Sequence, residues 1–202
     1  MKLTILHAFE RLLEETAYPD ISIDDICGTA YISKPTFYRY FKSKDNIFHW
    51  LTRLGFQHGV AEIGRSYSWE EGYLVSLLIA YRYRVFYAAP QSPELFSSLM
   101  DVGWNCQSDA IKETLVKYRG IQISEKLSYQ IESLARAQCH MARRWAVEGM
   151  AIPPATMAEY LASSAPYELH DLLGLEDTHD THDTRNEQSL VSHLVGHSGS
   201  LT

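Results

Sequence analysis

Apolar side chains near the start of the chain recur every three or four residues, which is the spacing of one face of a helix. The residues on this face are Ile5, Phe9, Leu12 and Leu13. We expect a first helix over residues 3–17, because Pro19 then stops the pattern. Ser22 and Asp25 have the spacing of a capping box, with Asp in place of the usual Glu, and predict a second, short helix that runs to about residue 30.

The next two helices are predicted from their caps and from the spacing of aromatic residues. Ser33 caps a third helix, because Pro35 falls in its first turn, where the missing N–H costs nothing. Phe37 and Phe41 are four residues apart on this helix, so both point inward. Ser43 caps a longer fourth helix with an apolar face made of Ile47, Leu51 and Leu54.

The chain from about residue 65 to residue 174 has the pattern of long helices rich in aromatic residues. Ser68 and Glu71 have capping-box spacing at the start of this part, and prolines and glycines divide the rest of it into segments. The expected helices cover residues 69–89, 93–103, 105–119, 124–149 and 154–173. Because no run of residues predicts a pair of strands, the expected fold class is all-α.

From residue 175 the helical pattern is lost among Thr, Asp, His, Ser and Gly, so we expect residues 175–202 to be a disordered polar tail. This tail holds four histidines, His179, His182, His193 and His197. Imidazoles spaced by three or four residues can share a metal ion on a helix, but here no cysteine or ordered framework accompanies them. We therefore predict neither a metal site nor another cofactor.

The composition agrees with a folded protein of the cytoplasm. Of the 202 residues, 46% are hydrophobic and 21% are charged, and no apolar run approaches the roughly 20 residues of a membrane span. No membrane partner is expected. The three cysteines, Cys27, Cys106 and Cys139, are scattered, which argues against a disulfide framework and a structural zinc site.

The net charge of −7, taken alone, argues against a nucleic-acid partner, but the charge is unevenly distributed along the chain. Residues 1–53 carry seven basic and seven acidic side chains, so the rest of the chain carries the whole net charge. Within this segment, residues 34–44 hold four positive side chains and no negative one. A local basic stripe on an acidic protein is typical of binding to DNA through one end of the molecule.

The two short helices joined by residues 30–33 have the size of a helix-turn-helix, in which the second helix enters the major groove. With Phe37 and Phe41 turned inward, the second helix exposes Lys34, Thr36, Tyr38, Arg39 and Tyr40, with Lys44 just beyond. These are residue types that contact phosphates and base edges. The competing interpretation is a solvated basic face with two incidental tyrosines.

The sequence SKPTFYRYFKSK of residues 33–44, with residues 22–27 and 5–9, resembles the TetR/AcrR-type transcriptional regulators. This resemblance covers about residues 3–50. It implies a recognition helix in the groove, Lys44 and Ser22 on phosphates, and Phe37 and Phe41 as anchors. The expected DNA-binding residues are Ser22, Ser33, Lys34, Pro35, Thr36, Tyr38, Arg39, Tyr40 and Lys44.

One departure from the family pattern concerns the turn before the recognition helix. The family usually has Gly or Asn where this chain has Tyr31. If the backbone φ is positive there, tyrosine costs about 1 kcal/mol relative to glycine. The angle between the two helices is therefore expected to differ slightly.

Aromatic residues crowd residues 56–118, where they either pack the core or line a cavity. An excess of tyrosine, 13 in all, brings hydroxyl groups that need partners when buried. His140 is expected to be a core histidine or a polar contact of that cavity. The candidate ligand-binding residues are Tyr73, Tyr81, Tyr87, Phe96, Trp104 and His140. The expected effector is a small, uncharged or weakly charged amphipathic molecule.

The segments 124–149 and 154–173 carry many small and apolar residues, and the first looks apolar on two faces. Such a helix is covered once by its own domain and once by a partner, which agrees with the four-helix dimer interface that the resemblance implies. We therefore expect a homodimer that binds a palindromic double-stranded operator.

Together these features predict a helix-turn-helix DNA-binding domain over residues 1–50 and a helical, ligand-binding and dimerisation domain over residues 51–174. The predicted function is a sequence-specific, ligand-responsive transcriptional repressor. One alternative is an activator, or a partner-regulated DNA-binding protein, of the same fold. Another is a helical enzyme, but no catalytic or phosphate-binding signature is placed with any specificity, so we expect no enzymatic activity.

Overall fold

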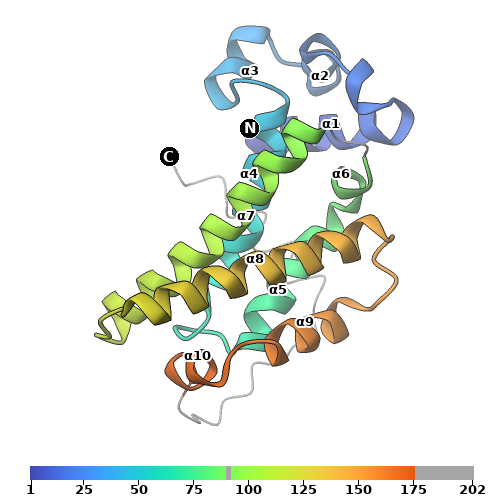
Figure 1. Ribbon diagram of the computed structural model, residues 1–202. Coiled ribbons are helices and arrows are strands. Elements are labelled where there is room, and N and C mark those ends of the chain that lie inside the picture. Colours follow the sequence, from blue (N-terminus) through green and yellow to red (C-terminus); the bar gives the residue numbers. More distant parts are fainter. Residues whose placement is uncertain (90–91, 176–202) are drawn as a thin grey trace.

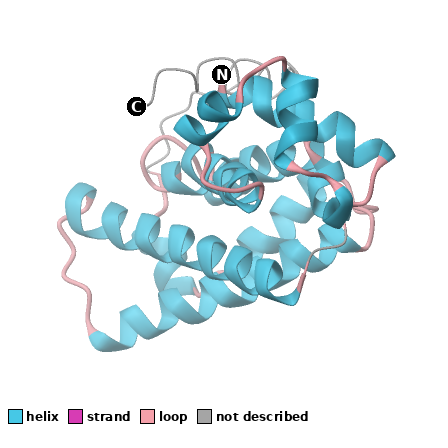
Figure 2. Cartoon of the chain, turned by 90° about the horizontal axis from the view of Figure 1, so that it is seen from above, coloured by secondary structure: helices cyan, strands magenta, loops and turns pink. Residues whose placement is uncertain are grey.

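The computed structural model describes residues 1–89 and 92–175, and these residues form an all-helical molecule (Figure 1). Viewed from above, the described residues consist of helices and the loops that join them (Figure 2). Within these ranges, the only β-type contact is an isolated bridge between Ile63 and Tyr67. The all-α fold class is confirmed.

The N-terminal part contains α1 (Lys2–Glu15), the 3-10 turn η1 (Tyr18–Asp20), α2 (Ile23–Ala30), α3 (Lys34–Tyr40) and α4 (Asp45–His58). These four helices were all predicted. The first was expected over residues 3–17, so α1 begins one residue earlier and ends two residues earlier than expected. The N-cap of α4 is Lys44, one residue after the expected Ser43, although Ser43 Oγ accepts a hydrogen bond from Asn46 N in the first turn at 3.3 Å. Phe9 and Phe48 meet edge to face in the core between α1 and α4, with ring centroids 5.6 Å apart.

The second part continues with η2 (Val60–Glu62), α5 (Trp69–Arg82), α6 (Arg84–Ala88), α7 (Pro93–Glu113), the π turn η3 (Thr114–Tyr118), α8 (Glu125–Val147), α9 (Pro154–Ser163) and α10 (Tyr167–Leu172). α7 runs away from the N-terminal helices to its junction with α8, which then crosses back over α5 to α9 (Figure 1). The helix α4 crosses residue 50, so it belongs physically to both parts. The division into domains at that residue stays a prediction.

Four predicted helices have different limits from those expected. The segment 69–89 is broken at Tyr83, whose ring is buried, and the new helix α6 points Phe86 into the N-terminal core. The predicted helices 93–103 and 105–119 are one helix, because Gly103 serves close packing: a Cβ there would lie 3.4 Å from Cys139 Sγ. The segment 154–173 is divided, because α9 ends at Ser163 and Pro166 is the N-cap of α10.

The C-terminal end of α4 is fixed tightly onto α5. Ser76 Oγ donates to the carbonyl of Gly55 at 2.9 Å and accepts from Val60 N at 3.2 Å, so one α5 side chain satisfies backbone groups at the end of α4. The backbones approach so closely that a Cβ on Gly59 would lie 2.3 Å from the carbonyl oxygen of Gly72. We call this contact the α4 clamp.

Candidate nucleic-acid interface and interior cavity

The helix-turn-helix is built as its caps predict. Ser22 Oγ accepts from Asp25 N, and the Asp25 carboxylate accepts from Ser22 Oγ at 2.6 Å and from Ser22 N at 2.8 Å. These bonds complete the capping box of α2, and the two bonds to the carboxylate lower the pKa of Asp25. Ser33 Oγ accepts from Thr36 N at 3.3 Å and caps α3. Phe37 and Phe41 are buried against the core, as predicted. The opposite face of α3 is therefore presented outward.

Most of the predicted recognition residues lie on this outward face. Ser33, Lys34, Pro35, Tyr38 and Arg39 are exposed. Thr36 is half-buried and donates or accepts a hydrogen bond with Ser33 Oγ at 3.0 Å. Tyr40 is also half-buried and packs against the N-terminal core, so its ring is less available than the sequence suggested. Contact of these residues with DNA stays a prediction.

Lys34 has an ionic partner in the free protein. Its ammonium lies 2.8 Å from a carboxylate oxygen of Asp24 on α2, and this hydrogen bond raises the pKa of Lys34. Both side chains are more than half exposed, so the pair contributes little to stability. A phosphate or a guanine edge that binds Lys34 has to replace Asp24.

Lys44 is engaged inside the protein. Its ammonium donates to the carbonyls of Tyr18 and Ile21 at 2.7 Å each and to that of Pro19 at 3.3 Å, and it lies 4.3 Å from the centroid of the Tyr18 ring. Burial of the ammonium lowers the pKa of Lys44. Lys44 thus ties the start of α4 to the turn between α1 and α2. Its predicted phosphate contact is untested, as is that of Ser22.

The turn between α2 and α3 has the backbone that the sequence suggested. Tyr31 lies in the left-handed region, with φ 54° and ψ 43°, and its N–H donates to the carbonyl of Gly28 at 3.2 Å. Its side chain is 94% exposed, so packing of the ring does not offset the backbone strain of the left-handed conformation. The strained residue precedes the recognition helix by three positions.

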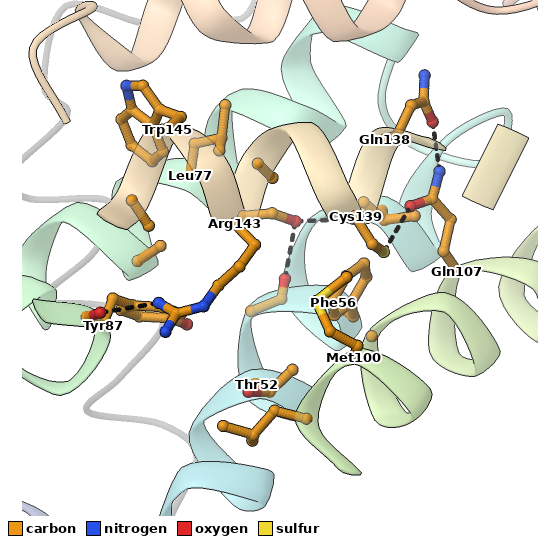
Figure 3. Close-up of a pocket in the computed structure, with 18 of the residues that line it drawn as sticks. Thr52, Phe56, Leu77, Tyr87, Met100, Gln107, Gln138, Cys139, Arg143 and Trp145 are labelled. Atoms are coloured by element: carbon orange, nitrogen blue, oxygen red, sulfur yellow. Dashed lines mark hydrogen bonds between the residues drawn. The ribbon is translucent and has the colours of Figure 1, made fainter. Parts of the chain in front are cut away.

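An interior cavity of about 130 Å³ lies among α4, α5, α6, α7 and α8 (Figure 3). Three of the predicted ligand-binding residues, Tyr73, Tyr87 and Phe96, line it. The other three do not line it, and ligand binding by any of the six stays a prediction. They lie elsewhere because their helices turn them away from the cavity: Tyr81 and His140 are exposed, and half-buried Trp104 stacks against Arg136.

One side of the cavity carries a cluster of neutral polar groups. Gln107 Nε2 donates to Tyr73 Oη at 2.9 Å and to Gln138 Oε1, and Tyr73 Oη also donates to Gln138 Oε1. Gln138 Nε2 donates to the carbonyl of Leu161 at 2.7 Å, and the thiol of Cys139 donates to Gln107 Oε1. Burial raises the pKa of Tyr73 and raises that of Cys139 to about 12, so both stay protonated at neutral pH.

Arg143 lies on the other side, beside Tyr87 (Figure 3). Its Nη1 donates to the carbonyl of Tyr87 at 2.8 Å, and its guanidinium lies 5.5 Å from the centroid of the Phe96 ring. Burial lowers the pKa of Arg143, but a guanidinium stays charged at physiological pH. Among the described residues that line the cavity, Arg143 is the only charged one.

Arg143, Gln107 and Gln138 were not predicted from the sequence. A signal for Gln138 was present, because it follows Ile131, Leu134 and Ala135 on the inward face of α8. A glutamine at such a position indicates a buried polar partner.

Phe86 connects the cavity to the N-terminal helices. Its ring lines the cavity and packs edge to face on Phe9 of α1 at 5.5 Å and on Phe48 of α4 at 5.3 Å. The cavity lining is therefore in direct contact, through Phe86, with side chains of α1 and α4.

Apolar side chains also remain exposed on the outer faces of α8 and α9. On α8 Tyr129 is 77% and Val147 60% exposed, and on α9 Tyr160 is 55% exposed. Beside Tyr129, the side-chain oxygen of Gln130 is buried without a hydrogen-bond partner. The predicted dimer interface would cover these residues, and its existence stays a prediction.

Two expectations concern metals and membranes. Within residues 1–89 and 92–175, no three His, Cys, Asp or Glu side chains gather where they could hold a metal ion. Every helix in the same ranges is too short or too polar to traverse a lipid bilayer. Of the predicted tail over residues 175–202, residues 176–202, with all four histidines, lie outside the described residues.

Comparison with known proteins identifies the N-terminal helices. Residues 5–51 match the family model of bacterial regulatory proteins, tetR family. The HTH-type dhaKLM operon transcriptional activator DhaS of Lactococcus lactis is 31% identical over 83 residues, which are 41% of this chain and 44% of DhaS. The HTH-type transcriptional regulator EthR of Mycobacterium tuberculosis is 50% identical over 46 residues, 23% of this chain and 21% of EthR. The chain therefore spans less than half the length of these curated relatives.

Solved structures extend the likeness of fold to the second part. The dihydroxyacetone kinase operon activator DhaS has a TM-score of 0.58 at 20% identity, over 85% of this chain and 95% of that one. The TetR family repressor AlkX from Dietzia has a TM-score of 0.55 at 16% identity, over 86% and 97%. At these identities the comparison shows that the folds are alike.

Proposed function

We propose that this protein is a sequence-specific, DNA-binding transcriptional regulator, because residues 5–51 match the family model of bacterial regulatory proteins, tetR family, and most of the chain is similar in fold to solved regulators. The observation that carries the proposal is the outward face of α3. Phe37 and Phe41 fix the inner face in the core, and Lys34, Tyr38 and Arg39 are left exposed. These side chains suit phosphates and base edges in the major groove.

The exposed apolar faces of α8 and α9 support a homodimer. Tyr129, Val147 and Tyr160 would each leave water in a symmetric four-helix contact between two copies. Two α3 helices would then reach half-sites about one helical turn apart, so the operator is expected to be palindromic.

The interior cavity supports a small-molecule effector. Some conformations of the dimer would place the two α3 helices at positions that do not fit the operator. A ligand that binds better to such a conformation increases its population, and the protein then leaves the operator. Phe86 would couple ligand binding to the DNA-binding helices, because it lines the cavity and contacts α1 and α4. The simplest regulator with a DNA-binding face and a ligand cavity is a repressor that its effector releases from the operator. The likeness to DhaS, which is named an activator, favours activation as the second candidate.

Catalysis in the cavity has no chemical support. The cavity thiol, Cys139, is protonated at neutral pH because burial raises its pKa to about 12. The described lining residues include neither an aspartate nor a glutamate. General acid-base or nucleophilic chemistry therefore lacks its usual groups.

Selection of bound duplexes from a random pool tests the proposal, and a palindromic consensus is the expected result. Lys34→Ala should then cost about 1 to 3 kcal/mol on the selected operator and much less on random DNA. Lys117→Ala on η3, at the far end of the molecule from α3, removes the same charge and is the control. No enrichment from the pool would contradict the proposal. A reporter gene downstream of the operator distinguishes repression from activation.

A further inference from the structure

We propose that the interior cavity binds a small apolar molecule without hydrogen-bonding groups, such as a single hydrocarbon ring or a short hydrocarbon chain. This inference narrows the amphipathic effector expected from the sequence to a ligand with no polar atoms. It names the ligand class of the effector site and so rests on the proposed function for its regulatory meaning. Binding of the ligand itself requires no DNA and is measured separately.

The first argument is that the neutral polar cluster of Tyr73, Gln107 and Gln138 already uses its donor hydrogens. The two amide hydrogens of Gln107 go to Tyr73 Oη at 2.9 Å and to Gln138 Oε1. Those of Gln138 go to the carbonyl of Leu161 at 2.7 Å and to Ser164 Oγ at 3.0 Å. The hydroxyl of Tyr73 donates to Gln138 Oε1. An acceptor on a ligand beside this cluster therefore gains a donor only by breaking one of these bonds.

Other polar side chains of the lining are engaged with the protein in the same way. Ser76 Oγ donates to the carbonyl of Gly55 at 2.9 Å, and Trp145 Nε1 donates to that of Ile152 at 2.8 Å. The thiol of Cys139 donates to an amide oxygen of the neutral polar cluster. These groups shape the wall, but their hydrogens point into the protein.

The opposite side of the cavity, around Tyr87, is occupied too. The hydroxyl of Tyr87 has Thr52 as its side-chain hydrogen-bond partner. Arg143 Nη1 donates to the backbone carbonyl of Tyr87 at 2.8 Å, and its guanidinium lies 5.5 Å from the centroid of the Phe96 ring. The guanidinium thus holds the end of α6, and a polar ligand would have to compete with that carbonyl.

These contacts make a polar group on the ligand a disadvantage. A hydroxyl or carboxylate that leaves water has to replace the hydrogen bonds that it made there, and the partners in this wall are already in use. One unreplaced hydroxyl is expected to weaken binding at least tenfold. A hydrocarbon loses no hydrogen bonds when it enters the cavity and gains contact with the apolar part of the wall.

The apolar part of the wall and the size of the cavity limit the ligand further. Phe56 of α4, Leu77 of α5 and Met100 of α7 surround the space from three helices (Figure 3). An engineered apolar cavity of about 150 Å³ accepts benzene. The present cavity, of about 130 Å³, therefore suits a single small ring or a short chain of similar volume.

Calorimetric titration of the full chain with toluene, phenol and benzoate tests the ligand class, because the three share one ring and differ in the group that it carries. Toluene should bind at least tenfold more tightly than phenol, and benzoate should bind more weakly than phenol. Equal or tighter binding of phenol or benzoate, or binding of none of the three, overturns the inference. This comparison uses the wild-type protein, so it decides the matter even if a variant does not fold.

Two variants locate the ligand and test the reason for its preference. Ala142→Leu fills part of the cavity and should abolish toluene binding, whereas Ala155→Leu, exposed on α9, is the control. Tyr73→Phe removes one partner from the neutral polar cluster, so the ratio of toluene affinity to phenol affinity should fall at least threefold. Tyr167→Phe, 85% exposed on α10, is its control. Toluene binding that survives Ala142→Leu, or a ratio that Tyr73→Phe leaves unchanged, contradicts the inference.

Repeating the titration with the selected operator separates the two proposals. Release of DNA by phenol or benzoate, but not by toluene, overturns the ligand class and upholds the effector function. Toluene binding that Ala142→Leu abolishes, but that has no effect on DNA, upholds the ligand class and contradicts the effector function.

Discussion

Replacing Lys44 by methionine separates a structural role of this lysine from a role in DNA binding. The ammonium donates to three backbone carbonyls and lies over the Tyr18 ring. A hydrogen bond from a charged group contributes about 1.5 to 3 kcal/mol, but Lys44 is only half-buried and water replaces part of the loss. We therefore expect Lys44→Met to lower the free energy of unfolding by about 2 kcal/mol in total.

Urea unfolding followed by circular dichroism measures this change, and Lys42→Met, an exposed lysine two residues away, is the control. DNA affinity should be measured well below the unfolding midpoint, where the variant is still folded. An unchanged free energy of unfolding, combined with a uniform tenfold loss of affinity on all duplexes, would refute the reasoning. Lys44 would then act on a phosphate and not on the turn after α1.

Gly59→Ala should lower the free energy of unfolding by about 3 kcal/mol, because its Cβ would lie 2.2 Å from Ser76 Oγ. Gly28→Ala, whose Cβ meets nothing within 4 Å, is the control. If both substitutions lowered the free energy of unfolding equally, close packing at the α4 clamp would be contradicted. Tyr31→Gly should raise the thermal midpoint, since strain of about 1 kcal/mol is relieved; a lower midpoint argues against strain. Cys139 should resist iodoacetamide at pH 8 until the protein unfolds, because its pKa is about 12, as mass spectrometry would show. Tyr129→Glu should convert the proposed dimer into monomers in sedimentation, and an unchanged dimer would place the interface elsewhere.

The helix-turn-helix could be predicted from the sequence because its determinants are local. Ser22, Ser33 and Pro35 set the helix starts within one or two turns of themselves, and Phe37 with Phe41 fixes the inward face. These signals need no knowledge of distant parts of the chain.

The cavity could be predicted only in part, because tertiary packing decides which side of each helix faces inward. Tyr73 and Tyr81 are eight residues apart on α5, yet only Tyr73 reaches the cavity. Gly103 falls at the end of a predicted helix, whereas in the structure it allows α7 to approach Cys139 on α8. The carbonyl partners of Lys44 lie more than twenty residues away in sequence, which no local pattern reveals.

The α4 clamp also constrains how such a protein can acquire a new ligand specificity. Ser76 lines the cavity and at the same time satisfies backbone groups at Gly55 and Val60. A mutation of Ser76 that reshapes the cavity therefore also loosens α4. Leu99 and Met100 line the same cavity on α7 and have no part in the clamp, so natural variation in ligand choice is expected to accumulate there while position 76 stays small and hydroxylated.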